Sequence, residues 1–406
     1  VLLSAHLCHP RPGANDNASG VAALLGIARV LTMKNGPCAK RGPGVRFLWG
    51  PEFTGIAAYL HDVVMAGAAP RPVLAVNVDM AGQNVARCGG PLVIERGPDD
   101  IPSFLPALAE RCAGLLPAQR SYSGAVPCDP WTWRASPFAG GSDHALLADD
   151  PIRSAVIALG HWPDRANHSS ADTPELVDPA ELRRTAAIAC ATVAAIRGRA
   201  DPELSGDVAD ATLSWAAAHL LAVLPGQRPG GTAASTDPGT IDPLANGSAW
   251  RLLRHRTEVS RGAIGSVSCA GAGQPWVRSA QAWVTSVADM VADRILPTVP
   301  RRSQDTAAAD GTALERHWNG PVNLRALAAA ARPEDRGWLA DQLAADRGGN
   351  YARSTALMRA VNGRRDWYEA TWWAALSSEL PITREFASRF LGLLGGTGWT
   401  SRGGCA

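Results

Sequence analysis

The sequence lacks several features that would each point to a particular class of protein. Neither charge is in excess, since 39 lysine and arginine residues face 37 aspartate and glutamate residues and the formal net charge is +2. Nucleic-acid-binding and polybasic membrane-surface proteins usually carry a clustered basic excess. No uninterrupted apolar run reaches the roughly 18 residues that a transmembrane helix needs. The composition therefore argues against nucleic acids and membranes as partners.

Closely spaced cysteines and a leader segment are also missing. The eight cysteines are scattered through 406 residues, and no two of them are spaced as Cys-x-x-Cys. This excludes a dense disulfide framework and favours reduced thiols. Residues 1–7 have the apolar character of a buried strand and lack the charged and apolar regions of a signal peptide. We therefore expect a cytoplasmic protein, and we interpret the start at Val1 as a truncation.

Enough apolar material is present for more than one folded core, because 46% of a long chain is hydrophobic. Short apolar runs alternate with segments of helical periodicity through the first half of the chain. The runs lie at residues 1–7, 45–49, 73–78 and 155–159, and the helical segments at residues 16–31, 56–65, 101–112 and 179–196. The alternation predicts an α/β sandwich with a parallel or mixed sheet over residues 1–200.

The second half of the chain has a different character. Residues 201–300 predict a helical extension of three helices joined by polar connectors rich in glycine and proline. Residues 298–314 are typical of a linker. Residues 315–406 predict a last helical unit, whose order of helix, tight turn and two helices is compatible with a winged-helix-like domain.

Side chains that could bind metal follow the predicted strands. His6 ends the first strand, Asp16 starts the helix after it, and Glu52, Asp79 and His168 follow the next three strands. Each of these residues alone has an ordinary explanation, such as a helix cap. Together they would meet at one edge of the sheet, where imidazoles and a bridging carboxylate can hold two zinc ions about 3.5–4 Å apart. The combination predicts a zinc site, because the clustered carboxylates would otherwise repel one another.

Several motifs in this order resemble the M28 family of zinc aminopeptidases over residues 1–198. They are Ala5-His6, the run at residues 13–25, Asp79-Met80-Ala81-Gly82, Ser142-Asp143-His144, and the run from His168 to Thr173. The forms His6-Leu7-Cys8-His9-Pro10 and Pro51-Glu52 resemble an aminopeptidase-like subgroup that has a winged-helix-like C-terminal domain.

The resemblance implies a three-layer sandwich of the zinc exopeptidase type. It also implies a hydrolase that uses a zinc-activated water to remove N-terminal amino acids from peptides or amides. His6 and Asp79 would bind one zinc, Glu52 and His168 would bind the other, and Asp16 would bridge the two ions. The substrate would be a peptide or an aminoacyl small molecule, and a homo-oligomer is compatible with this assignment.

The catalytic residues implied are Glu52, Asp143 and His144, but one position departs from the family pattern. The family has two glutamates after the second strand, the first of which is the general base, and this chain has Pro51-Glu52. Glu52 is therefore either a zinc ligand, with the base supplied by His9, Asp143 or His144, or it is the base itself.

The histidine motif at the first strand departs from the pattern as well. Cys8 occupies the place where the family often has an aspartate that orients the first histidine, and His9 is an additional histidine that could ligate or hydrogen-bond. Two zinc ions are expected, with one as the alternative. A single-zinc acyl-transfer or cyclase-like enzyme of the same fold, and a catalytically weak aminopeptidase-like binding scaffold, stay open as other functions.

Overall fold

The computed structural model describes residues 1–9, 11–33, 42–116, 119–120, 127–129, 131–224, 239–295 and 311–402. Contacts within the chain divide it into two units. The first holds residues 1–136, 141–215 and 262–280, and the second holds residues 137–140, 216–261 and 281–406. The boundaries expected at residues 200, 300 and 315 stay predictions, and residues 298–310 of the expected linker lie outside the described residues.

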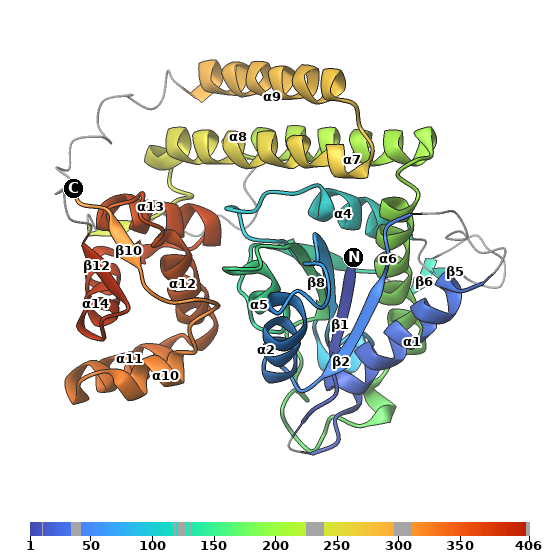
Figure 1. The fold of residues 1–406 in the computed structure, drawn as a ribbon, viewed down its shortest axis with the longest axis horizontal. Coiled ribbons are helices and arrows are strands. Elements are labelled where there is room, and N and C mark those ends of the chain that lie inside the picture. The colour runs from blue at the N-terminus through green and yellow to red at the C-terminus, as the bar shows by residue number, and fades with distance from the viewer. Residues whose placement is uncertain are drawn as a thin grey trace. The chain divides into compact units, whose positions relative to one another are not determined.

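A six-stranded sheet forms the centre of the first unit (Figure 1). Its spatial order is β2 (Arg46–Gly50), β1 (Leu2–His6), β3 (Leu74–Val78), β8 (Ala155–His161), β4 (Leu92–Glu95) and β7 (Trp133–Ser136). The first four strands are parallel to one another, and β4 and β7 run in the opposite direction. The sheet is therefore mixed, as expected, although the sequence indicated only its four parallel strands.

Helices cover both faces of this sheet and complete a three-layer sandwich. In Figure 1, α1 (Gly20–Leu31) and α6 (Pro179–Arg197) lie on one side of the sheet and α2 (Thr54–Tyr59) and α5 (His144–Ala148) on the other. Helix α4 (Leu105–Leu115) packs on α6. Apolar residues of the strands and of α1 and α6, among them Leu3, Leu24 and Ile188, are fully buried between the layers. This confirms the predicted fold class.

The remaining elements of the first unit are short. They are η1 (Ala14–Ser19), η2 (Leu60–Met65), α3 (Val85–Cys88), β5 (Gln119–Arg120), β6 (Pro127–Asp129), η3 (Pro174–Leu176) and η5 (Val267–Ala270). One of them corrects the predicted helix at residues 16–31, because Asp16 and Asn17 have non-helical dihedral angles and α1 begins only at Gly20.

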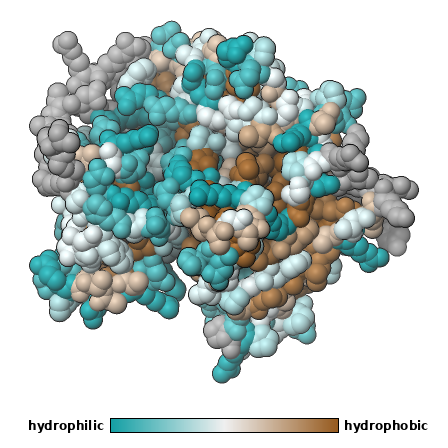
Figure 2. Space-filling view, in the orientation of Figure 1, coloured by the Kyte–Doolittle hydropathy of each residue, from teal (hydrophilic) through white to brown (hydrophobic). Residues whose placement is uncertain are grey.

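Three long helices, α7 (Pro202–Leu221), α8 (Ala249–Ser266) and α9 (Gln274–Ile295), contribute residues to both units. They correspond to the three helices expected in residues 201–300. None of the helices in the described ranges is both long enough and apolar enough to cross a membrane. On the visible face of the molecule, hydrophilic and hydrophobic residues are mixed, and a broad hydrophobic area lies over the first unit (Figure 2).

The C-terminal part of the second unit is mostly helical. Its elements are β9 (Thr240–Ile241), η4 (Asn246–Ser248), β10 (Leu314–Arg316), α10 (Leu324–Ala330), α11 (Pro333–Ala345), α12 (Arg347–Ala360), α13 (Trp367–Ser378), β11 (Ile382–Thr383), α14 (Arg384–Gly396) and β12 (Thr400–Arg402). Side-chain caps start four of these helices, at Asn323, Asp346, Asp366 and Thr383. The winged-helix likeness of this part stays a prediction.

Candidate metal centre

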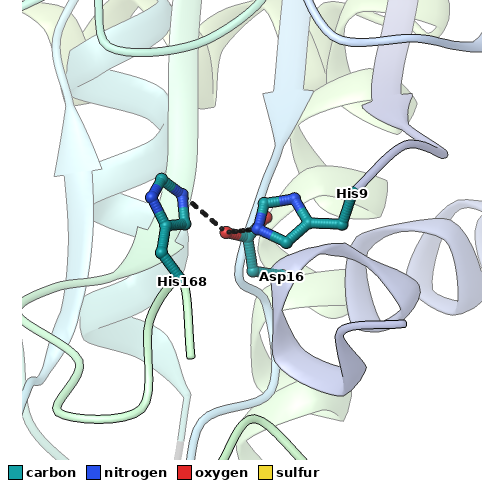
Figure 3. Close-up of side chains that lie close together, drawn as sticks. All are labelled: His9, Asp16 and His168. Carbon is teal, nitrogen blue, oxygen red and sulfur yellow. Dashed lines mark ion pairs between the residues drawn. The ribbon is translucent and has the colours of Figure 1, made fainter. Parts of the chain in front are cut away.

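Asp16 lies at the centre of a cluster of three imidazoles at the carboxyl edge of the sheet. Its Oδ1 atom is 3.2 Å from Nε2 of His6, and its Oδ2 atom is 3.4 Å from Nε2 of His9 and 3.2 Å from Nε2 of His168. Figure 3 shows His9 and His168 converging on the Asp16 carboxylate. The two oxygens of one buried carboxylate thus face different imidazoles, so this carboxylate could contribute to the binding of two metal ions.

Two groups of potential ligand atoms result from this arrangement. Within each group the atoms lie within 4.8 Å of one another, and the groups are His9 with Asp16 and His168, and His6 with Glu52 and Asp79. All five sequence-predicted ligands are therefore in one cluster. The grouping differs from the implied one in a single respect, because Glu52 lies with His6 and Asp79 while His9 lies beside His168.

The main chain of Cys8 orients two of the imidazoles. Nδ1 of His6 is 3.0 Å from the Cys8 carbonyl oxygen, and Nδ1 of His9 is 3.2 Å from the same oxygen. A carbonyl oxygen can only accept, so in both rings Nδ1–H donates and the Nε2 atom that faces Asp16 is the one left to ligate. The thiol of Cys8 also accepts the backbone N–H of Glu52 at 2.9 Å. Cys8 thus links the first strand to the segment that carries Glu52.

The carboxylate of Asp172 holds the backbone on which Asp16 is placed. It accepts the backbone N–H groups of Asn15 at 2.8 Å and of Asp16 at 2.9 Å. Because these hydrogen bonds use main-chain donors, the side chain of Asp16 stays directed at the imidazoles. Asn167 adds a side-chain donor to Oδ2 of Asp16 at 3.1 Å.

Asn17 connects the same turn to the end of strand β3. Its side-chain nitrogen donates to the Val78 carbonyl, and its side-chain oxygen accepts the backbone N–H groups of Gly20 and Met80. Asp79, a predicted ligand, lies between Val78 and Met80. The hydrogen bonds therefore set the position of Asp16 relative to Asp79, and they compete with helical geometry at residues 16 and 17.

Hydrogen bonds and charges within the cluster shift the pKa values of His6 and Asp16 in opposite directions. Burial disfavours the imidazolium of His6, but hydrogen bonds to Asp16 and Asp79 outweigh it and raise the pKa of His6 to about 11. Burial likewise opposes ionisation of Asp16, yet the His6 hydrogen bond and the charges of His9, His6 and His168 hold its pKa below the usual value. In the metal-free chain, the proton on His6 thus provides positive charge beside Asp16 and Asp79 that a bound cation could replace.

Two further carboxyl groups are harder to ionise. Burial and the charge of Asp79 raise the pKa of Glu52 to about 7. Burial raises the pKa of Asp143 to about 6, although the hydrogen bond from the backbone N–H of Phe53 opposes this rise. Oδ1 of Asp143 accepts that hydrogen bond at 2.7 Å. Asp143 therefore holds the residue next to Glu52.

His144, the third residue assigned to catalysis from the sequence, is directed elsewhere. Its Nε2 atom lies 2.7 Å from the carboxylate of Glu95, at the end of β4, and its side chain is 2% exposed. Among the described residues, neither group of potential ligand atoms includes His144. His144 is thus a partner of Glu95 within the fold.

The donor set fits zinc. It consists of three imidazoles and three carboxylates, which are the nitrogen and oxygen ligands that zinc prefers. Sequence reasoning did not commit to His9 or notice Asn167. The His-x-x-His spacing of His6 and His9 was the available signal for the first, and adjacency to His168 was the signal for the second.

Comparisons with known proteins bear on the first unit. Residues 1–193 match Peptidase family M28. A putative peptidase from Clostridium acetobutylicum is 20% identical with a TM-score of 0.37, over 48% of this chain and 41% of its own. An aminopeptidase from Aneurinibacillus sp. strain AM-1 is 19% identical with a TM-score of 0.34, over 47% of this chain and 42% of its own. No curated protein matches.

The match over residues 1–193 therefore supports the resemblance to the M28 peptidase family that the motifs indicated. Members of this family are typically zinc-dependent, and the cluster around Asp16 supplies residues that could hold metal. The class of the domain is that of a metallopeptidase-type hydrolase. The aligned part spans less than half of either solved structure, so activity and substrate belong to the proposal below.

Proposed function

We propose that this chain is a zinc-dependent aminopeptidase that releases N-terminal amino acids from peptides or aminoacyl amides. The observation that carries the proposal is the position of Asp16, whose two oxygens face His6 on one side and His9 and His168 on the other. When bound there, a pair of zinc ions supplies Lewis acidity for the scissile carbonyl and lowers the pKa of water.

The ligands that we assign from the expected set are His6, Asp16, Asp79 and His168. Asp172 and Asn17 fix the backbone around Asp16, and the Cys8 carbonyl fixes the tautomer of His6. Their common effect is to keep the ligand atoms in place before the substrate arrives, so that little reorganisation is needed during the reaction.

Glu52 is the residue that we assign to proton transfer. Its carboxyl group lies with His6 and Asp79, where it can take a proton from the attacking water and deliver it to the leaving amine. Asp143 and His144 are engaged with Phe53 and Glu95 respectively. They support the site by positioning the segments that carry them.

The direct test measures zinc content and the release of p-nitroaniline from aminoacyl p-nitroanilides. We expect two zinc ions per chain and turnover that chelation abolishes and zinc restores. N-acetylated substrates should not be cleaved, since the enzyme acts at a free N-terminus. A chain loaded with two zinc ions that hydrolyses no member of a broad aminoacyl panel would refute the proposal.

The proline at position 51 favours a second candidate activity, acyl transfer by a single-zinc enzyme of the same fold, because only one carboxylate follows β2. A single bound zinc together with cyclisation of N-terminal glutaminyl peptides would assign the acyl-transfer chemistry instead.

Glu52→Gln should lower kcat by about 100- to 10,000-fold if Glu52 is the general base. Glu175→Gln is the matched control, because Glu175 is an exposed glutamate of the same unit.

A further inference from the structure

The second group of ligand atoms includes a residue to which the family pattern gives no role. His9 lies in the place beside His168 that the resemblance gave to Glu52. We propose that His9 is a metal ligand and completes, with Asp16 and His168, a site of two imidazoles and one carboxylate. This inference rests on the proposed metal-dependent function and names the ligands of one of its two ions.

The geometry around Asp16 carries the inference. Nε2 of His9 and Nε2 of His168 approach the same oxygen, Oδ2, at 3.4 and 3.2 Å. The two rings are 5.0 Å apart between centroids and tilted by 52°. A cation near Oδ2 would therefore meet two imidazole nitrogens directed at it from two sides, as Figure 3 shows.

The orientation of the His9 ring is also that of a ligand. Its Nδ1–H donates to the Cys8 carbonyl, which is the same acceptor that orients His6. A ligating histidine usually donates its other ring N–H to a carbonyl or carboxylate in this way. One main-chain oxygen thus turns the two histidines of the His-x-x-His sequence toward opposite oxygens of Asp16.

Exposure at this group is suited to a reaction site. Asp16 is 5% exposed, His9 is 21% exposed and His168 is 62% exposed at the side chain. Three protein ligands with one open side are typical of catalytic zinc, whereas structural zinc is usually closed by four. The open side of the His9, Asp16 and His168 group leaves room for water or substrate.

If His9 is a ligand beside His168, Glu52 is not needed as a ligand at that site. With two imidazoles and Asp16 already present, this site needs no further protein ligand, and Glu52 lies in the other group. A neutral imidazole in place of a carboxylate also removes one negative charge from the site. The site should therefore favour zinc or cobalt over the harder magnesium and manganese ions.

The experiment titrates the metal-free 406-residue chain with zinc and, in parallel, with cobalt, whose visible absorption reports on its ligands. His9→Gln should bind one ion normally and lose the second by more than about 100-fold in affinity, since even a supporting hydrogen bond to a ligand contributes 10- to 100-fold. Glu52→Gln should keep both ions. His61→Gln is the matched control, because the His61 side chain is 86% exposed and pairs with Asp62, away from both groups of ligand atoms.

The outcomes separate this inference from the proposed function. Binding of both ions with parental affinity in His9→Gln would overturn the inference while leaving a two-zinc peptidase intact. Absence of turnover in the parent chain would overturn the peptidase, and the metal titrations would still decide the role of His9. Retention of the first ion in His9→Gln, with a metal-free unfolding midpoint like the parent's, shows that the variant is folded.

Discussion

The carboxylate of Asp172 accepts the backbone N–H of Asp16 at 2.9 Å, across 156 positions of sequence. It accepts the neighbouring N–H of Asn15 as well. Both carboxylates are buried, but they have different partners, because main-chain N–H groups donate to Asp172 whereas imidazoles face Asp16. Asp172, the one carboxylate in the run from His168 to Thr173, thus acts on the candidate metal centre through the backbone of Asn15 and Asp16.

Replacement of Asp172 should damage both stability and metal binding. Asp172→Ala leaves two backbone donors without their acceptor, and each should cost about 1–3 kcal/mol of unfolding free energy. Zinc affinity should fall by about 10- to 100-fold, since Asp16 loses its support. Denaturant unfolding and zinc titration measure the two effects. Asp62→Asn, at an exposed carboxylate, is the control, and parental values in Asp172→Ala would contradict this role.

Metal binding should release protons. The pKa of His6 is raised to about 11, mainly because hydrogen bonds to Asp16 and Asp79 overcome the effect of burial. At neutral pH the metal-free chain therefore carries an imidazolium that an incoming cation must displace. Affinity should weaken by about tenfold for each unit by which the pH falls below the pKa, for one proton exchanged.

Calorimetry in buffers of different ionisation enthalpy measures that release directly. A binding enthalpy that is the same in all buffers would show that no proton leaves. Removal of metal by a chelator should also lower the unfolding midpoint, because an ion that binds only the native state stabilises it by mass action.

The buried pair of His144 and Glu95 should make stability depend on pH. Burial opposes the imidazolium, but the charge and hydrogen bond of Glu95 outweigh it and raise the pKa of His144 above its ordinary value of 6.5. A raised pKa in the folded state means that the stabilisation is complete below pH 6.5 and is lost as the pH rises through the folded-state pKa.

Glu95→Gln removes the charge and keeps a hydrogen-bonding side chain. The difference in unfolding free energy between the parent and this variant should be largest below pH 6.5 and should shrink in alkaline solution. Denaturant unfolding at several pH values measures it, and a difference that grows as the pH rises would contradict the assigned protonation.

The sequence predicted the part of the fold that depends on continuous apolar runs. Strands β1, β2, β3 and β8 were found because each contains a continuous apolar run that follows or precedes a helix, although β2 is only half-buried. Strands β4 and β7 have only four residues each, and β7 is only partly buried, so their pattern is too short to stand out. Their existence depends on pairing with distant strands, which no local pattern records.

The sequence predicted those residues of the candidate site that lie directly at the carboxyl ends of strands. His6 and Asp79 follow that rule, and the motif around Asp16 is distinctive. The sequence did not predict the non-helical backbone at residues 16 and 17. Hydrogen bonds to Asp172 and to the Val78 carbonyl, which are distant in sequence, stabilise that backbone in place of a helix. The approach of His9 to His168 is likewise a relation between loops far apart in sequence.

Two glycines of α1 provide a paired test of how tightly that turn is packed. A Cβ atom added at Gly20 would collide with the side-chain oxygen of Asn17 and with the Val78 carbonyl, whereas one added at Gly26 has no heavy atom within 4 Å. Gly26→Ala should stabilise the chain by about 0.5–1 kcal/mol, because alanine is favoured over glycine in a helix.

Gly20→Ala gains the same helix propensity but must displace Asn17 or strand β3, so it should destabilise the chain by about 1–3 kcal/mol. It should also weaken zinc binding, because Asn17 sets the position of Asp16 relative to Asp79. Denaturant unfolding and zinc titration of both variants measure this, with Gly26→Ala as the control. If Gly20→Ala matched Gly26→Ala in stability and zinc affinity, the contact between Asn17 and the β3 loop would not govern the geometry of the metal centre.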